Sequence, residues 1–199
     1  MRETTRTFIA IPIPDPIGQQ LARWQQELAP EIPGCRWVET QPLHITLAFL
    51  GDVPNRDLSE LCLAVAAAAE TSGRLDLSVE GLGAFPSPAR PRVLWAGVTA
   101  ADLGPLGTLR EAVVRAATRA GYRPDDPRFH PHVTLGRIRS DRGRPTDLTE
   151  IIAREQGRSA GSFTAAEVVT YSSTFGKGKT AYAPLNRARL KGKKPDAAH

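Results

Sequence analysis

Apolar residues recur every three or four positions in four segments of the chain, and this spacing predicts four helices. The first begins at Asp15 and Pro16, where a capping residue precedes a first-turn proline. Asp57 and Glu60 resemble a capping box at the start of the second. Glycines at the ends of the other patterns provide natural stops. The predicted helices cover residues 15–28, 57–73, 106–121 and 146–157.

Seven further segments are rich in alternating apolar and β-branched residues and are flanked by glycine or proline, which predicts strands. They are residues 7–13, 44–50, 75–83, 92–98, 132–138, 163–174 and 180–190. Helices and strands alternate, yet strands follow one another directly at 75–98 and 163–190. This mixture predicts an α+β fold with mainly antiparallel sheets rather than a doubly wound parallel sheet. The sequence has no glycine-rich phosphate loop of the Walker or dinucleotide type.

The length of 199 residues suits one domain, or two tightly packed half-domains. We expect a single bilobal domain over residues 1–190 and a basic, flexible tail over residues 191–199. No apolar run approaches the roughly 20 residues that cross a bilayer, and the N-terminus lacks the pattern of a signal peptide. The expected location is therefore the cytoplasm, with no membrane partner. Cys35 and Cys62 are isolated and are expected to be free thiols.

The charge of the chain favours polyanionic partners. The net charge is +5 and the isoelectric point is near 9.6. Part of this excess lies in the tail, which can add nonspecific RNA affinity without forming the site. Nothing in the sequence demands more than a monomer.

The sequence His-x-Thr-Leu occurs twice, at residues 44–47 and 132–135, each time inside a predicted strand. The two copies start 88 residues apart, close to half the chain, and each follows a proline within two residues. This repetition predicts a duplicated strand–helix unit. We therefore expect two pseudo-symmetric lobes of mainly antiparallel sheet, with helices on the outer faces and a cleft between the lobes.

Residues i and i+2 of a strand share one face, so His44 and Thr46 point the same way, and so do His132 and Thr134. Phe49 is expected on the opposite face, in the core. A two-fold axis would bring two imidazoles and two hydroxyls together across the cleft. One neutral imidazole can take a proton from a nucleophile while one imidazolium protonates a departing oxygen. The hydroxyls can hold phosphate oxygens, so this set of groups suits phosphodiester chemistry.

Two other interpretations of these histidines are open. A single histidine in an apolar strand is more often a structural residue than a catalyst, but two copies with the same threonine favour catalysis. A metal site is the second alternative, because His130 and His132 lie two residues apart and Asp125 and Asp126 are nearby. A metal site would leave the threonines unexplained.

The segments "HITLAFLG" and "FHPHVTLGR" resemble the two His-x-Thr-x motifs of the 2H phosphoesterase superfamily. Within it, the chain is most similar to the RNA 2′,3′-cyclic phosphodiesterases, historically called 2′-5′ RNA ligases. The resemblance extends over the whole chain, and it includes "RTFIAIPIPDPI", "CRWVETQPLHITLAFLGDV", "FPSPARPRVLWAGV" and "YSST". The two motifs are specific as a pair and weak singly.

The resemblance implies a bilobal α+β fold whose histidines face each other across the cleft, with no cofactor and no required metal. It also implies hydrolysis of a 2′,3′-cyclic phosphate at an RNA end to leave a 2′-phosphate. By motif position, His44 would be the general acid that protonates the departing 3′ oxygen, and His132 would be the general base that activates water. Thr46 and Thr134 would bind the phosphate. A weaker reverse reaction would join RNA ends through a 2′-5′ linkage.

The expected partners are RNAs that end in a 2′,3′-cyclic phosphate, with tRNA fragments among the candidates, or cyclic nucleotides. Two alternative functions stay open at this point. One is an RNA- or nucleotide-binding module without turnover, and the other is a phosphodiesterase for small cyclic nucleotides.

Several neighbouring residues are candidates for RNA contact. Members of the resembled family commonly carry arginine at the position of Arg137, but regular alternation places it opposite the motif residues unless the strand bulges. Trp37 and Phe129 are equally suited to stacking on a base and to the core. The loops at 141–145 and 175–179 carry cationic groups that could meet an RNA backbone.

Overall fold

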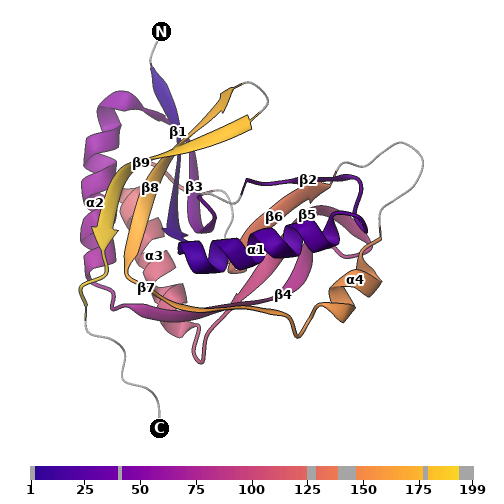
Figure 1. Cartoon of the computed structure of the whole chain (residues 1–199). Helices are drawn as coiled ribbons and strands as arrows, with labels where there is room; N and C mark the ends of the chain where they lie inside the picture. Colours follow the sequence, from indigo (N-terminus) through magenta and orange to yellow (C-terminus); the bar gives the residue numbers. More distant parts are fainter. Residues whose placement is uncertain (1–2, 40–41, 125–128, 139–146, 177–178, 193–199) are drawn as a thin grey trace.

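The computed structural model describes residues 3–39, 42–124, 129–138, 147–176 and 179–192. Its strands form a curled sheet with helices packed against it (Figure 1). The helices are α1 (Asp15–Leu28), α2 (Leu58–Glu70), α3 (Gly104–Arg119) and α4 (Thr149–Arg154), and a 3-10 turn covers Asn55–Asp57. The strands are β1 (Thr4–Pro12), β2 (Cys35–Trp37), β3 (His44–Pro54), β4 (Leu75–Ser87), β5 (Arg90–Thr99), β6 (His132–Ile138), β7 (Ser159–Ala165), β8 (Glu167–Gly176) and β9 (Lys179–Arg189).

The described strands belong to one nine-stranded sheet with the order β7-β4-β5-β6-β3-β1-β8-β9, and β2 pairs with β6 outside this path. Each of these neighbouring pairs is antiparallel. The two halves of the sheet meet at β3 and β6, where Ile45 lies opposite Val133. The two motifs therefore lie at the middle of the sheet. The predicted α+β fold with mainly antiparallel pairing is confirmed.

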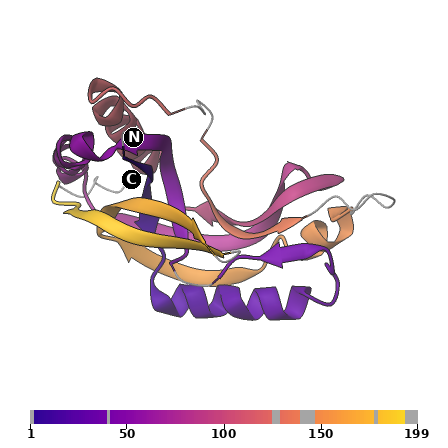
Figure 2. The ribbon, with the colours of Figure 1, turned by 90° about the horizontal axis from the view of Figure 1, so that it is seen from above.

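The helices cover the face of the sheet that holds the hydrophobic core. In one half, α1 packs against β7 and α4 against β4, whereas in the other half α2 packs against β8 and β9 and α3 against β3. Figure 2 shows α1 lying beside the sheet and α2 and α3 close together at one end. The apolar stripe of α1, from Ile17 to Leu28, joins Ile45 and Val133 in one continuous core. The opposite face of the sheet carries a separate cluster around Phe8 and Tyr171.

All four predicted helices are present, but neither predicted cap makes a side-chain hydrogen bond. Asp15 is the first helical residue, and Pro14 occupies the cap position without a side-chain hydrogen bond. Asp57 occupies the cap position of α2, as predicted, but makes no capping hydrogen bond. Its carboxylate instead accepts a hydrogen bond from the Tyr122 hydroxyl at 2.6 Å. This bond ties the start of α2 to the residues that follow α3, so a tertiary contact uses the carboxylate that the local cap would need.

The strand predictions need two corrections. The segment predicted as one strand over 163–174 is divided between β7 and β8, because the strand assignment breaks at residue 166 and the two strands pair in different halves of the sheet, β7 with β4 and β8 with β1 and β9. Strand β2 was not predicted, since three residues are too short to show a period. The predicted start of the fourth helix at residue 146 lies outside the described residues.

The expectations for the cysteines, for membrane crossing and for the C-terminal tail can also be compared with the structure. Cys35 and Cys62 are both free, as predicted. None of the helices in the described ranges combines the length and the apolar character that crossing a bilayer requires. Of the predicted tail, residues 193–199 lie outside the described residues. Lys191, at the start of that tail, forms an ion pair with Glu70 at 2.8 Å.

Candidate active site

The two motif histidines begin the two central strands. His44 is the first residue of β3 and His132 is the first residue of β6. Ile45 and Val133 are fully buried in the core and lie opposite each other in the antiparallel register. One step along that register brings His44 near Thr134 and Thr46 near His132, all on the face away from the core. We call this side of the sheet the motif face.

Both central strands contain a β-bulge at the same point of the motif. Between β1 and β3, Ala10 pairs with Thr46 and Ile9 with Ala48, so Leu47 is the extra residue. Between β5 and β6, Trp95 pairs with Thr134 and Leu94 with Gly136, so Leu135 is the extra residue. A bulge moves every later side chain to the other face of the strand. The duplication therefore extends beyond the residue pattern to the irregularity of the backbone.

The bulge in β3 overturns the expectation for Phe49. Its ring is 56% exposed, and it lies 5.5 Å from the ring of Phe8 in the cluster on the motif face. The prediction that Phe49 belongs to the core was wrong because Leu47 and Ala48 both turn inward. An exposed phenyl ring beside the motif can stack on a base.

The bulge in β6 likewise places Arg137 on the motif face. This residue pairs with Val93 of β5, which alternates with the core residue Leu94 and shares a face with Trp95. Arg137 is exposed, while its neighbour Ile138 is buried in the core. The condition set by the sequence, that Arg137 reaches the motif face only through a bulge, is therefore met.

Each motif histidine is held by a hydrogen bond to the backbone two residues earlier. The Nδ1 of His44 lies 3.0 Å from the carbonyl oxygen of Pro42, and the Nδ1 of His132 lies 2.7 Å from that of His130. A carbonyl can only accept a hydrogen bond, so Nδ1 must carry the hydrogen in both rings. This fixes the tautomer and leaves both Nε2 atoms for proton transfer.

Burial lowers the pKa of both histidines below the ordinary value of 6.5. The hydrogen bonds to the backbone act in the opposite direction. The charge of His132 further lowers the pKa of His44. His130 has the same effect on His132. A bound phosphate anion would counter this shift and favour the protonated form of either ring.

Aromatic side chains surround each histidine, and the sequence did not point to them. The His44 ring lies 4.8 Å from Phe8 and 5.2 Å from Tyr182, measured between ring centroids. The His132 ring lies 5.1 Å from Phe85 and 6.0 Å from Trp95. These rings exclude water from one side of each imidazole, which explains the burial. These aromatic residues can be recognised only by their positions on strands of the same sheet, and the sheet order is not evident from the sequence.

Gly83 of β4 makes room for the Trp95 ring. A Cβ atom at this position would lie 2.1 Å from the ring carbons of Trp95, which is far closer than any real contact. Any larger residue at position 83 would displace Trp95 and with it the wall beside His132.

The other candidates are not brought into this group. Trp37 and Phe129 both pack against the hydrophobic core, and the guanidinium of Arg110 lies 5.1 Å from the centre of the Phe129 ring. Within the described residues no three His, Cys, Asp or Glu side chains form a group that could hold a metal ion. Asp125 and Asp126, the possible partners of His130 in a metal site, lie outside the described residues, as does the loop at 141–145.

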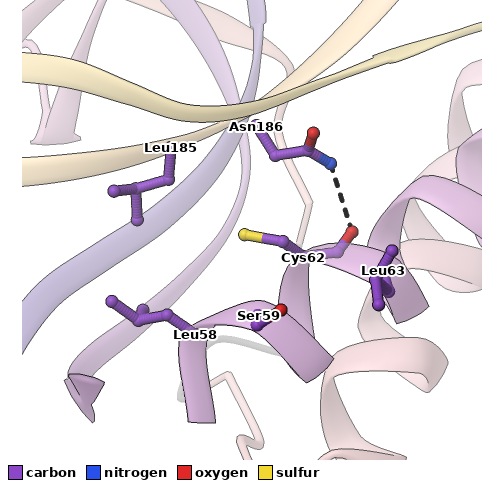
Figure 3. Close-up of a pocket in the computed structure, with 6 residues that line it drawn as sticks. All are labelled: Leu58, Ser59, Cys62, Leu63, Leu185 and Asn186. Atoms are coloured by element: carbon purple, nitrogen blue, oxygen red, sulfur yellow. Dashed lines mark hydrogen bonds between the residues drawn. The ribbon is translucent and has the colours of Figure 1, made fainter. Parts of the chain in front are cut away.

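A surface pocket lies away from the motifs, between α2 and β9 (Figure 3). Leu58, Ser59, Cys62, Leu63, Leu185 and Asn186 line it. The Asn186 amide donates a hydrogen bond to the Cys62 carbonyl at 3.3 Å and so links the helix to the strand. Burial raises the pKa of the Cys62 thiol, which makes this sulfur a poor nucleophile at neutral pH.

An antiparallel sheet that presents two matched His-Thr pairs on one face has the arrangement of a two-histidine phosphoesterase. Comparison with known families agrees: the model of the LigT-like phosphoesterases matches residues 11–95 and 100–182. Each matched stretch contains one His-x-Thr-Leu motif. The chain belongs to the LigT-like phosphoesterase family.

Relatives and solved structures lead to the same family. The RNA 2′,3′-cyclic phosphodiesterase of Escherichia coli is 32% identical over 190 residues, which are 96% of this chain and 99% of that protein. The enzyme of the same name from Geobacillus stearothermophilus is 38% identical over 130 residues, which are 65% of this chain but only 41% of that protein. The structure of E. coli LigT complexed with 3′-AMP has a TM-score of 0.75 at 30% identity, and the match covers 94% of this chain and 99% of that one.

Acid is expected to destabilise the fold through the two motif histidines. Their pKa values in the folded protein lie below 6.5, so between those values and 6.5 the unfolded chain binds more protons. The free energy of unfolding should therefore fall as pH decreases through this window. Urea unfolding at about pH 7.5 and about pH 5.5 measures the change. The double variant His44→Gln, His132→Gln should lose less stability than the wild type, and an equal loss would show that these histidines are not responsible.

Proposed function

We propose that this protein hydrolyses 2′,3′-cyclic phosphates at RNA ends and leaves a 2′-phosphate. The observation that carries the proposal is the matched pair of imidazoles. In each, Nδ1 donates to the backbone carbonyl two residues earlier and Nε2 is left for proton transfer. The activity named for the E. coli relative, which aligns over nearly its whole length, supports the same substrate.

The proposed reaction needs one acid and one base on opposite sides of the phosphorus. His132 takes a proton from water as the water oxygen attacks the phosphorus atom in line with the P–O3′ bond. His44, in its protonated form, gives its Nε2 proton to O3′ as that bond breaks. The hydroxyls of Thr46 and Thr134 donate hydrogen bonds to the non-bridging oxygens. The proton balance closes, because one imidazole gains a proton and the other loses one.

Ligation follows from the same geometry when a 5′-hydroxyl replaces water as the nucleophile. His132 takes the hydroxyl proton, His44 protonates O3′ as the P–O3′ bond breaks, and a 2′-5′ linkage forms. The two histidines exchange roles when that linkage is cleaved to re-form the cyclic phosphate. We propose this 2′-5′ ligation as a weak side activity. No step in either direction requires a metal ion, so both activities are expected to survive chelation.

Different residues after the two matched bulges make the pseudo-symmetric site asymmetric. At the position that follows each bulge, β3 carries Phe49 and β6 carries Arg137. A base stacked on Phe49 lies on the β3 side, where the ribose places O3′ near His44. Arg137 lies on the opposite side, where its guanidinium can bind phosphate oxygens. The structure of E. coli LigT complexed with 3′-AMP shows that a structural neighbour binds a nucleotide, which supports a nucleotide as ligand here.

Replacing Phe49 by alanine is expected to raise KM for an oligonucleotide with a 2′,3′-cyclic phosphate about fivefold or more, because one stacking contact is lost. kcat should change little, since the acid and the base are untouched. Leu63→Ala is the matched control, because it removes another exposed apolar side chain, from α2. An unchanged KM in Phe49→Ala would remove Phe49 from the substrate site.

The proposed enzyme acts as a monomer in the cytoplasm. All four motif residues come from one chain, so catalysis needs no second copy. The two free thiols suit a reducing compartment.

Turnover in the presence of EDTA tests the proposal. The purified protein is incubated with an oligonucleotide that ends in a 2′,3′-cyclic phosphate and, separately, with a 2′,3′-cyclic mononucleotide. We expect hydrolysis of the oligonucleotide at the same rate with and without EDTA. Preference for the mononucleotide would favour a small-substrate phosphodiesterase, and binding without turnover would indicate a binding module.

A further inference from the structure

Gln25 is a polar residue on the buried face of α1. It is 7% exposed and lies on the stripe that also buries Leu21, Trp24 and Leu28. An amide in an apolar core costs free energy unless its hydrogen-bonding groups find partners. The hydrogen-bond partners of the Gln25 amide therefore show what this buried polar side chain does.

Both hydrogens of the Gln25 amide are used at one point of the sheet. Nε2 donates to the carbonyl oxygen of Val38 at 3.0 Å and to the carbonyl oxygen of Leu135 at 2.9 Å. The backbone N–H of Val38 donates to the same Leu135 oxygen at 2.9 Å. The side chain thus joins α1, the residue after β2 and the central strand β6.

Leu135 is the extra residue of the bulge in β6. Its carbonyl accepts from Val38, the residue that follows β2, so it faces the β2 side of β6 rather than β5. Gln25 and Val38 supply the two donors that this carbonyl can accept. Strand β2 also packs closely here, since a Cβ atom on Gly136 would lie 2.3 Å from the sulfur of Cys35.

The bulge decides which side chains of β6 reach the motif face. Without it, regular alternation would place Arg137 on the core side, opposite His132 and Thr134. We propose that Gln25 is a positioning residue for the phosphodiesterase reaction: it holds the Leu135 bulge, and through it the placement of Arg137. This inference rests on the proposed function, but Gln25 itself lies on the core side and touches no substrate.

The first test compares two identical changes on the same helix. Gln25→Met removes both donors and keeps the length of the side chain, whereas Gln26→Met makes the same change at an exposed position. We expect kcat/KM for a cyclic-phosphate oligonucleotide to fall about tenfold in Gln25→Met, because a small displacement of a binding group is costly. Gln26→Met should match the wild type. Equal activity of the two variants would overturn the proposal.

The second test separates positioning from a loss of stability. Arg137→Ala is combined with Gln25→Met in a double-mutant cycle. If Gln25 acts through Arg137, then Gln25→Met should cost less than about twofold in the Arg137→Ala background. The same tenfold cost in both backgrounds would show that Gln25 acts only through general stability, and would overturn the proposal.

Gln25→His covers the case in which Gln25→Met does not fold. Its imidazole keeps one N–H donor near the bulge where the Gln25 amide has two, so its activity should fall below that of the wild type. The cycle with Arg137→Ala is then run on this variant, with the same deciding outcomes. Wild-type turnover is measured first, so absence of the activity altogether would contradict the proposed function rather than the role of Gln25.

Discussion

Replacing His44 or His132 by alanine should lower kcat by about 10² to 10⁴-fold, the usual contribution of a positioned acid or base. The fold should persist, because the motif face lies opposite the main core and neither ring belongs to that core. Circular dichroism and a thermal melt check the fold, and single-turnover kinetics measure the chemical step. His130→Ala is the comparison, because it keeps the backbone carbonyl that bonds to the His132 ring. It removes a neighbouring imidazole that lies 4.7 Å from Trp95 and lowers the pKa of His132, so its loss of kcat should be far smaller than that of either motif variant. Full activity in either alanine variant would contradict the mechanism.

The two histidines should differ in one respect. A substrate with sulfur in place of the 3′ bridging oxygen has a better leaving group and needs little protonation. It should restore much of the activity of His44→Ala and none of that of His132→Ala. Recovery of activity in His132→Ala instead would show that His132 is the acid and His44 the base.

Replacing both threonines by valine should lower kcat/KM by about 10²-fold or more, because two hydrogen bonds to the phosphate are lost. Valine keeps the shape and the β-branch of threonine, so the strands should pair as before. Thr46→Ser with Thr134→Ser is the matched control, because serine keeps both hydroxyls. We expect the serine variant to retain most of the activity. Equal activity of the valine and serine variants would remove the hydroxyls from phosphate binding.

Much of the candidate site could be predicted from the sequence because the evidence is local. His44 with Thr46, and His132 with Thr134, follow from the i, i+2 rule on one strand. Their closeness followed from the repeat, and the pairing of Ile45 with Val133 accounts for it.

The faces of Phe49 and Arg137 could not be predicted in the same way. The residues around Leu47 and Leu135 alternate no differently from a regular strand, and the bulges arise from how β1 and β5 pair with them. Gln25 left one local signal, a polar residue on the apolar stripe of α1. That signal indicates that the Gln25 amide has a buried hydrogen-bond partner, but it does not identify the carbonyls that accept its hydrogen bonds.

The central claim is that two histidines on one sheet face cleave the P–O3′ bond of a cyclic phosphate without a metal. The most direct measurement is the position of the phosphate in the product. An oligonucleotide with a 2′,3′-cyclic phosphate is hydrolysed in EDTA, and the terminal nucleotide is identified against 2′- and 3′-phosphate standards. The account predicts a 2′-phosphate from the wild type and almost no product from His44→Ala or His132→Ala. A 3′-phosphate, or turnover that EDTA abolishes, would contradict it.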